Sequence, residues 1–337
     1  MSLRDATLTA LRGDEVPAAV LEAAFGEIAD GKASPVAIAG LLVALRAKGE
    51  SVDEIVAAAR ALRARAAPAP AVDPRAIDTC GTGGDAAGTF NVSTAAAFVV
   101  AGAGVPVAKH GNRAASSRAG SIDVLEALGV RCEIPVERSA AILARVGIAP
   151  FFARVAHPAM RHLAPVRSEL GLRTLANCLG PLLNPVGVRR QVVGVYAAEL
   201  VAPIAAALGR LGSERALVVH GSDGLDEITT TGTSEAALFE AGEVRPLRID
   251  PAELGLPRAS GAALRGGDAS ENAAILRAVL AGELGPPRDL VCVNAAAALW
   301  VAGAAADLAE GMERARASLD SGAARERLAR LVEATAS

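Results

Sequence analysis

The stretch RAIDTCGTGGDAAGTFNVSTAAAFVVAGAGVPVAKH covers residues 75–110 and is the part of the chain that decides the fold class. Its pattern predicts a short apolar strand over 76–80, a glycine-rich turn, a helix over 93–102 and a second strand over 105–109. Strands that alternate with helices in this way are typical of a largely parallel sheet with helices on both faces. The sequence therefore predicts an α/β domain with a mainly parallel central sheet.

The same alternation continues toward the C-terminus. Further segments of strand character lie at 192–196, 215–221, 234–240 and 290–294. Segments of helical character lie at 120–128, 137–146, 200–211, 270–282 and, with breaks, 295–336. Residues 161–190 fit neither pattern.

The segment that precedes this stretch has a different pattern. Apolar residues recur at helical spacing from residue 5 to 66, with breaks near Gly13, at 31–35 and at 49–53, which predicts a bundle of about four helices. Ser51 followed by Glu54 fits a capping box at the start of the last helix. The proline-rich segment AAPAPAVDP (66–74) then predicts a linker. We expect a helical domain over 1–70, joined by part of 161–190, and an α/β domain over 75–337.

The composition excludes several classes of protein. The 337 residues carry 34 Lys and Arg against 37 Asp and Glu, and this net charge of −3 argues against a protein that coats nucleic acid. The four cysteines show no disulfide or metal-binding spacing, so we expect reduced thiols in a cytoplasmic protein. The N-terminus lacks the apolar core of a signal peptide, and Gly, Asn and Pro interrupt the longest uncharged stretch, so no membrane segment is expected.

The turn Asp78-Thr79-Cys80-Gly81-Thr82-Gly83-Gly84-Asp85 is the strongest chemical signal. Closely spaced glycines let a backbone approach an anion, and the free N–H groups of the following helix attract phosphate. An ordinary tight turn would explain the glycines equally well. The turn also satisfies the spacing of a dinucleotide-binding motif, but that motif needs an acidic residue at the end of the second strand. Lys109-His110 stands there instead, which favours a second phosphate contact.

Three other clusters follow predicted strands or lie near the helical part. Lys109, the only lysine beyond residue 48, leads the basic group KHGNR, and with His110, Arg113 and Arg118 it forms a local cluster suited to a polyanion. The pair Asp226-Glu227 offers carboxylates for Mg²⁺ on a pyrophosphate ligand, although a solvated surface is the simpler explanation of an isolated pair. His157 and Arg167 lie in the third cluster, where Arg167 would clamp a small carboxylate or form an interdomain salt bridge.

Together these motifs resemble the anthranilate phosphoribosyltransferase family of tryptophan biosynthesis. The resemblance rests on DTCGTGGD, FNVST, KHGNR, GSIDVLEALG, HPAMRHLAPVR, the RT-to-GPLLNP stretch, GLDEIT and LRGGDASENA, and it spans nearly the whole chain. It implies a helical domain with a larger α/β domain, a homodimer, and transfer of the phosphoribosyl group from PRPP to the amino group of anthranilate. It also implies Mg²⁺, with two ions per active site.

The resemblance further assigns roles to single residues. PRPP binding is assigned to Gly81, Thr82, Gly83, Gly84, Asp85, Thr89, Asn91, Ser93, Thr94, Lys109, Ser117 and Ser121. Anthranilate binding is assigned to Gly81, His110, Asn112, His157 and Arg167. Mg²⁺ binding is assigned to Ser93, Asp226 and Glu227. Lys109, Asn112 and Arg167 are the expected catalytic residues, and no residue is identified as a general base.

Two other functions stay open from the sequence. A pyrimidine nucleoside phosphorylase shares this architecture, although its usual signature differs at KHGNR and lacks the GLDEIT pair. A non-catalytic relative that binds nucleic acid is disfavoured by the net charge of −3 and by the intact acidic pair.

Overall fold

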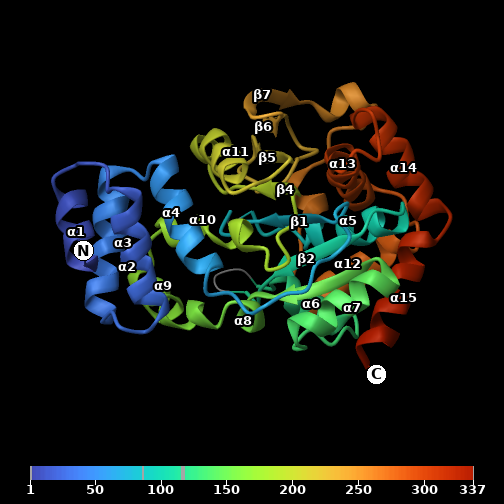
Figure 1. The fold of residues 1–337 in the computed structure, drawn as a ribbon. Coiled ribbons are helices and arrows are strands. Elements are labelled where there is room, and N and C mark those ends of the chain that lie inside the picture. The colour runs from blue at the N-terminus through green and yellow to red at the C-terminus, as the bar shows by residue number, and fades with distance from the viewer. Residues whose placement is uncertain (1, 86, 115–117, 337) are drawn as a thin grey trace.

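A small helical part and a larger α/β part make up the molecule, which we describe from a computed structural model. The structure describes residues 2–85, 87–114 and 118–336. In Figure 1 the N-terminal helices lie together on the left, and the sheet with the C-terminal helices lies on the right. This arrangement agrees with the predicted fold class.

A sheet of seven strands forms the centre of the α/β part, in the order β3-β2-β1-β4-β5-β6-β7. The strands are β1 (Ile77–Gly81), β2 (Val107–Gly111), β3 (Ile148–Phe152), β4 (Arg190–Gly194), β5 (Arg215–Gly221), β6 (Ser234–Glu240) and β7 (Glu243–Ile249). The first five strands run parallel, and β6 and β7 are antiparallel additions at one edge. The sheet is therefore mainly parallel.

Helices cover both faces of this sheet. The helices are α1 (Leu3–Leu11), α2 (Ala18–Ala29), α3 (Pro35–Lys48), α4 (Val52–Arg63), α5 (Val92–Gly102), α6 (Ser121–Ala127), α7 (Val136–Val146), α8 (Ala153–Ala156), α9 (Ala164–Leu170), α10 (Leu175–Cys178), α11 (Val201–Arg210), α12 (Ala269–Leu280), α13 (Pro286–Val301), α14 (Leu308–Asp320) and α15 (Ala323–Ala336). Short 3₁₀ turns are η1 (Pro158–His162), η2 (Gly180–Leu183), η3 (Ala198–Leu200), η4 (Pro251–Leu254) and η5 (Gly261–Leu264).

Alternation along the strands divides the apolar side chains between two cores. Val192 and Leu217 belong to one core together with residues of α5, α13 and α15, whereas Val193 and Val218 belong to the other, which includes α11. Successive side chains of a strand point to opposite faces, so both faces are buried. The second core continues into α1–α4, which therefore pack on the α11 side of the sheet.

The helical part forms as its sequence predicts. Ser51 and Glu54 make the expected capping box at the start of α4, and the buried Glu54 also accepts hydrogen bonds from Lys48 Nζ and Val16 N. Residues of α9, α10 and η2, which lie within 161–190, share the apolar core of α1–α4. The segment 66–74 contains no helix or strand and connects α4 to β1.

Several strand predictions differ from the structure, including 105–109, which is β2 at Val107–Gly111. Residues 290–294 were expected as a strand but lie inside α13, where Leu290, Val291, Cys292 and Val293 are buried on all sides among other helices. A short apolar run looks alike in a buried strand and a buried helix, so its pattern misled the prediction. Strand β4 begins at Arg190 rather than at 192, and strands β3 and β7 were not predicted. Among the described residues, no helix is long and apolar enough to cross a membrane.

Candidate active site

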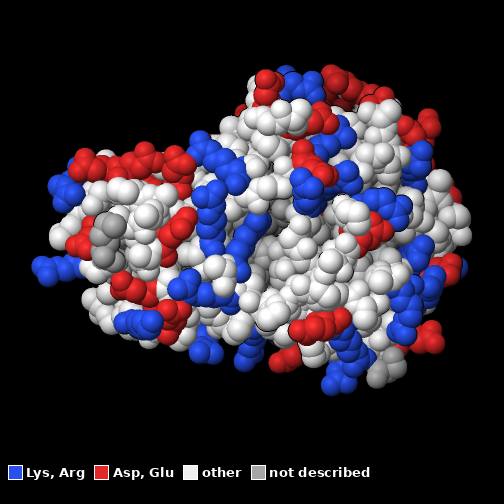
Figure 2. Space-filling model, viewed as in Figure 1, with Lys and Arg blue, Asp and Glu red and all other residues white. Residues whose placement is uncertain are grey.

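Many of the predicted site residues that the structure describes lie at or just beyond the carboxyl ends of the parallel strands. Strand β1 lies between β2 and β4. From β1 the chain adds β2 and β3 on one side, and it then returns to add β4 and β5 on the other side. In open α/β sheets this switch in connection direction opens a crevice beyond the strand ends, where ligands bind. Figure 2 shows basic side chains gathered between the helical part and the α/β part, across the middle of the molecule.

The glycine-rich turn leaves the end of β1 in an open conformation. Gly83 and Gly84 have φ angles of 66° and 76°, a region that side chains with a Cβ rarely adopt. Thr82 N donates to Gly194 O of β4 at 2.9 Å, and Thr82 Oγ1 accepts from Tyr196 N at 3.1 Å. Gly81 lies against Asp226, and a Cβ at Gly81 would overlap the carboxylate of Asp226. The base of the turn is therefore anchored to β4 and to Tyr196 just beyond it.

Asp226 and Glu227 reach the same turn from the loop after β5. Asp226 Oδ2 accepts from Gly83 N at 2.7 Å, and Glu227 Oε1 accepts from Ser93 N in the first turn of α5 at 3.0 Å. Burial raises the pKa of Asp226 well above its ordinary value, and the Glu227 and Asp85 carboxylates raise it further. Burial also raises the pKa of Glu227 to about 7, although Lys109 opposes this change.

The pKa values of Asp226 and Glu227 are raised because the two carboxylates are buried close together with too little positive charge nearby to balance them. Oxygen ligands of this kind, crowded and desolvated, suit a hard divalent cation, which would lower both pKa values and relieve their repulsion. The residues present therefore fit the Mg²⁺ that the sequence predicts. Ser93 places its side chain at the same point, with Ser93 Oγ 3.5 Å from Lys109 Nζ.

Lys109 is buried beneath the phosphate turn. Its side chain is 3% exposed, and Lys109 Nζ donates to Thr79 O of β1. The neighbouring Asp78 is fully buried and accepts from His110 N and from Asn184 Nδ2. Burial raises the pKa of Asp78, and the Lys109 charge partly offsets that rise. The ammonium is therefore held in place from one side and directed toward Ser93 on the other.

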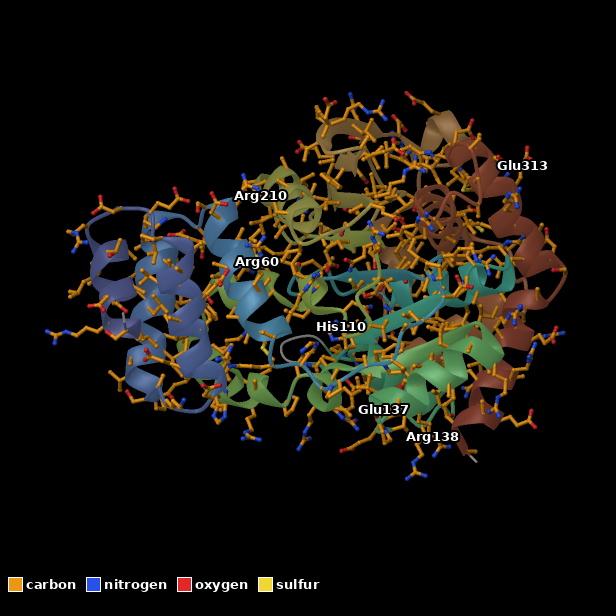
Figure 3. All side chains as sticks on the ribbon, viewed as in Figure 1. Arg60, His110, Glu137, Arg138, Arg210 and Glu313 are labelled. Atoms are coloured by element: carbon orange, nitrogen blue, oxygen red, sulfur yellow. The ribbon has the colours of Figure 1, made fainter. Side chains whose placement is uncertain are left out.

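His110 and His157 meet on the side of the site that faces the helical part. Their ring centroids are 5.3 Å apart in an edge-to-face arrangement, and Figure 3 places His110 in the middle of the molecule. Burial lowers the pKa of His110 to about 3 and that of His157 to about 4. Both rings are therefore neutral at pH 7, and His157 Nε2 donates to Leu183 O. Among the described residues, His110 Nε2, His157 Nδ1 and Arg167 Nε are buried without a hydrogen-bond partner.

Arg167 lies in α9 and is mostly buried, and this burial lowers its pKa from the ordinary arginine value. A desolvated guanidinium with an unpaired Nε is suited to a small carboxylate.

The remaining predicted residues lie around the same strand ends. Asn91 lies directly before α5 without capping it through its side chain, Thr94 is fully buried one residue beyond Ser93, and Thr89 forms an isolated bridge with Arg265. Asn112 is exposed just after β2, and Ser121 Oγ donates to Asn112 O. Ser117 lies outside the described residues.

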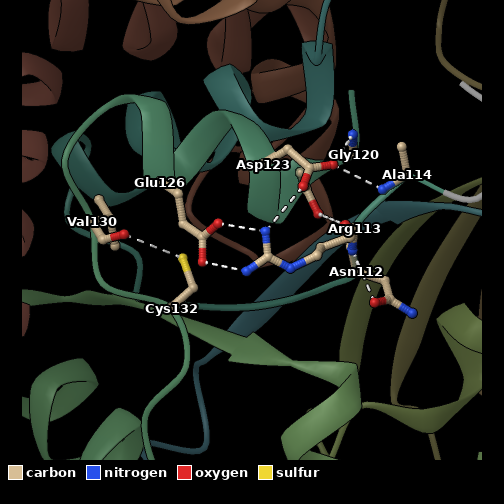
Figure 4. A network of polar contacts seen from close by, with 9 residues as sticks. Asn112, Arg113, Ala114, Gly120, Asp123, Glu126, Val130 and Cys132 are labelled. Atoms are coloured by element: carbon tan, nitrogen blue, oxygen red, sulfur yellow. Dashed lines mark hydrogen bonds and ion pairs between the residues drawn. The ribbon is translucent and has the colours of Figure 1, made fainter. Parts of the chain in front are cut away.

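Two of the four side chains expected to form a basic cluster are paired with carboxylates. The guanidinium of Arg113 pairs with Glu126 at 2.7 Å and with Asp123 at 3.3 Å, as Figure 4 shows. Arg118 NH2 lies 3.3 Å from Glu271 Oε2. These two charges are balanced by carboxylates on α6 and α12, so Lys109 is the cation of this group that reaches the phosphate turn.

Two residues at the site were missed by sequence reasoning. Arg173, which follows α9, donates to Gly84 O and stacks on the ring of Tyr196 at 4.3 Å. Tyr196 follows β4 and also contacts Cys178 through its hydroxyl. The position of this single tyrosine at the end of a predicted strand is a signal that could have identified it.

Comparison with known proteins agrees with this geometry. Residues 73–325 match the "Glycosyl transferase family, a/b domain", and residues 4–66 match the "Glycosyl transferase family, helical bundle domain". The anthranilate phosphoribosyltransferase of Rhodospirillum rubrum is 58% identical over 92% of this chain and 89% of its own length. The chain belongs to the anthranilate phosphoribosyltransferase family.

Other members of the family match over nearly their full length. The anthranilate phosphoribosyltransferase of Rubrobacter xylanophilus is 55% identical over 98% of this chain and 96% of its own length. The crystal structure of the Thermus thermophilus enzyme is 48% identical, covers 99% of this chain and all of its own, and has a TM-score of 0.93. The Saccharomyces cerevisiae enzyme in complex with PRPP and Mg is 28% identical over 99% of this chain and 98% of its own, with a TM-score of 0.90.

Proposed function

We propose that this chain transfers the 5-phosphoribosyl group of PRPP to the amino group of anthranilate. The products are N-(5-phosphoribosyl)anthranilate and pyrophosphate, and the reaction is a step of L-tryptophan biosynthesis. One observation carries the proposal: the glycine-rich turn is in contact with the Asp226-Glu227 pair at the switch point of the sheet, where His110 at the end of β2 meets His157. That combination occurs in a chain of the anthranilate phosphoribosyltransferase family.

The chemistry follows from the charge that develops as the bond between ribose C1 and pyrophosphate breaks. Negative charge grows on the leaving group, and preorganised donors lower the barrier most when they are already directed at that charge. Lys109 and the N–H groups of Gly84 and Asp85 in the turn supply such donors, whereas the N–H groups of Thr82, Gly83 and Ser93 are bonded to Gly194, Asp226 and Glu227. Thr82, Thr89, Asn91, Thr94, Ser117 and Ser121 complete the assigned PRPP site.

Mg²⁺, when bound, supplies further positive charge to the leaving pyrophosphate. We assign it to Ser93, Asp226 and Glu227, with two ions per active site. Among the described residues, no group of three His, Cys, Asp or Glu side chains is arranged around one metal position. The remaining ligands would then come from water or PRPP oxygens.

A metal titration tests this assignment. Asp226→Asn and Glu227→Gln should raise the Mg²⁺ concentration for half-maximal activity and reduce the increase in thermal midpoint that Mg²⁺ with PRPP produces. Glu235→Gln, which changes an exposed carboxylate on β6, is the matched control. Wild-type metal dependence in both site variants would remove the pair from the metal site.

The acceptor, anthranilate, binds on the side of ribose C1 opposite to the pyrophosphate. Arg167 binds the carboxylate of anthranilate, and His110, His157 and Gly81 form the walls of its site. Both histidines are neutral at pH 7, so the guanidinium of Arg167 supplies the positive charge of the anthranilate site. The aromatic amine is itself unprotonated at that pH and keeps its lone pair. Asn112 lies between the two substrates, and no residue is needed as a strong base because the amine becomes acidic as the C–N bond forms.

We further propose that the helical part, over 1–70 with part of 161–190, closes on the α/β part, over 75–337, and excludes water. Segments 66–74 and 161–190 connect the two parts and are the hinge candidates. We also propose a homodimer in the cytoplasm. The exposed Leu8 and Leu11 of α1 and Val36 and Val43 of α3 support an interface, and four buried free cysteines fit a reducing compartment.

The activity itself is tested with purified protein, MgCl₂, PRPP and anthranilate. We expect the fluorescence of anthranilate to decrease with time. The amount of pyrophosphate released should equal the amount of anthranilate consumed. No decrease at saturating substrate would contradict the proposal. Release of free base from a pyrimidine nucleoside and phosphate would favour the phosphorylase, and binding of nucleic acid without either reaction would favour the non-catalytic relative.

A further inference from the structure

The motif LRGGDASENA (264–273) has no role in the function described so far, although it lies beside the PRPP side of the site. It leads from η5 into α12, and Asp268 caps that helix by accepting from Ser270 N and Glu271 N. The capping box fixes the start of the helix and with it the position of Asn272, four residues beyond the cap. Asn272 is 2% exposed.

The first half of the motif pairs with the backbone that precedes α5. Arg265 forms an isolated antiparallel bridge with Thr89, and Gly266 N donates to Gly88 O at 2.9 Å. The contact is too close for a side chain, because a Cβ at Gly266 would lie 2.6 Å from Phe90 N and 2.7 Å from Phe90 Cα. The motif is therefore packed directly against the segment that carries Asn91.

The second half of the motif reaches the side chain of Asn91. Gly267 N donates to Asn272 Oδ1 at 2.7 Å, and Asn272 Nδ2 donates to Asn91 Oδ1 at 2.9 Å. Asn91 Nδ2 in turn donates to Ala119 O at 3.2 Å. These three hydrogen bonds form a chain that runs in one direction, from a backbone N–H through two side-chain amides to a backbone carbonyl.

The direction of these hydrogen bonds determines where the oxygen and the nitrogen of the Asn91 amide lie. A backbone N–H can only donate, so the oxygen of Asn272 must face Gly267 and its nitrogen must face Asn91. Asn91 must then accept with its oxygen and direct its nitrogen to the opposite side. An isolated asparagine amide could turn over at little cost, but this chain holds it in one orientation.

We propose that Asn272 is a positioning residue that orients the amide of Asn91 for PRPP. The inference rests on the proposed function, in which Asn91 belongs to the PRPP site. With the amide held, Asn91 Nδ2 keeps its second hydrogen as a donor for an oxygen of PRPP. The motif thus prepares the site before the substrate arrives and removes the cost of ordering this side chain.

The informative variant is Asn272→Asp, which preserves size and shape. Its carboxylate still accepts from Gly267 N but cannot donate to Asn91 Oδ1, so Asn91 should turn over and direct its oxygen to the opposite side. PRPP affinity of the full chain, measured by calorimetry with MgCl₂ and without anthranilate, should fall about tenfold, the effect of losing one well-placed hydrogen bond. The KM for anthranilate should change less than twofold.

Two comparisons separate this effect from a change in charge or in packing. Ser270→Asp adds the same charge on an exposed position of the same helix and should leave PRPP affinity within twofold of the wild type. In an Asn91→Ala background, Asn272→Asp should cause no further loss, because the residue through which it acts is gone. Should Asn272→Asp fail to fold, Asn272→Ala removes the donor without burying a charge, and the same two comparisons apply.

Wild-type PRPP affinity in the Asn272 variant would overturn the inference, and so would an equal loss with and without Asn91. These results differ from a failure of the proposed function. If the proposed function were wrong, the wild-type protein itself would not bind PRPP with MgCl₂. If only the inference about Asn272 were wrong, the wild-type protein would bind PRPP and the Asn272 variant would bind it equally well.

Discussion

Arg167 is mostly buried, and its Nε has no hydrogen-bond partner. Burial of an unpaired charged group lowers the stability of the folded protein unless a ligand binds it. The arginine lies in a short helix of the segment 161–190, and burial alone lowers its pKa. A charged hydrogen bond to a carboxylate contributes about 1.5–3 kcal/mol.

Replacement of Arg167 tests that role directly. We expect Arg167→Ala to raise the KM for anthranilate about 10- to 100-fold and to leave the KM for PRPP within about twofold, since each 1.4 kcal/mol corresponds to a factor of ten. Steady-state kinetics with each substrate varied in turn would measure both. Arg161→Ala, an exposed arginine in η1, is the control. A larger effect on PRPP than on anthranilate would contradict the assignment.

Among the elements, the loop between β5 and β6 depends most on its neighbours. Asn294 of α13 donates to Ile228 O at 2.9 Å and accepts from Ile228 N at 2.9 Å, directly beside Glu227. Asp223 accepts from Thr229 Oγ1 and Thr231 Oγ1, both at 2.7 Å. The carboxylates therefore stand on a loop that side chains hold from both ends.

Gly194 at the end of β4 lets this loop approach the sheet. A Cβ at that position would overlap the carbonyl oxygen of Asp226, so Gly194→Ala should move the loop away from the phosphate turn. We expect kcat/KM to fall at least about tenfold and the Mg²⁺ requirement to rise. Gly261→Ala, where an added methyl group meets open space, should behave as the wild type. Unchanged metal dependence in Gly194→Ala would show that the loop tolerates the added atom.

The two parts of the molecule are joined by hydrogen bonds from arginine side chains of α4 to backbone carbonyls. Arg63 at the end of α4 donates to Leu182 O at 2.6 Å and to Leu211 O at 3.0 Å, and burial lowers its pKa to about 10. Arg60 and Arg210, which Figure 3 labels at this boundary, also meet, with Arg60 NH2 3.4 Å from Arg210 O. The same junction buries His157.

Burial of neutral histidines makes the stability dependent on pH. The unfolded chain takes up a proton on each histidine below about pH 6.5, whereas the folded chain does so only near pH 3 for His110 and pH 4 for His157. Their contribution is therefore complete above pH 6.5 and is lost as the pH falls toward 4. At pH 5 the loss amounts to about 2 kcal/mol for each histidine.

Urea unfolding at pH 7 and pH 5 would measure this loss. His157→Asn should lose about 2 kcal/mol less than the wild type between the two pH values, because one titrating group is absent. His162→Gln, a half-buried histidine in η1, should lose as much as the wild type. An equal loss in His157→Asn and the wild type would contradict the prediction.

The proposed homodimer is tested on the apolar surface of the helical part. Leu11 is 67% exposed and Val36 is 83% exposed, on two helices that pack against each other. We expect the wild type to sediment as a dimer and the double variant Leu11→Glu, Val36→Glu to sediment as a monomer, since two buried charges would oppose the interface. Leu284→Glu, at a position 82% exposed beyond α12, should stay dimeric. A dimeric double variant would place the interface elsewhere.

Local patterns were sufficient for much of this molecule. The period of the apolar residues predicted the helical N-terminal part and the parallel sheet, and the glycines after β1 predicted the turn at its end. These features depend on residues close in sequence, where turn chemistry and side-chain periodicity act directly. The same kind of pattern failed at 290–294, because burial on all sides removes the periodicity that separates a helix from a strand.

Contacts between different segments could not be predicted from the sequence. The charge of Arg113 is taken up by Glu126, and Asn91 is oriented by Asn272, which lies 181 positions away. Residue types alone state what a side chain can donate or accept, but not which partner stands within 3 Å of it. The sequence by itself thus determined the elements and the chemical groups available to the site. The packing of the sheet, the loops and the helical part decided which of those groups meet and in what state of charge.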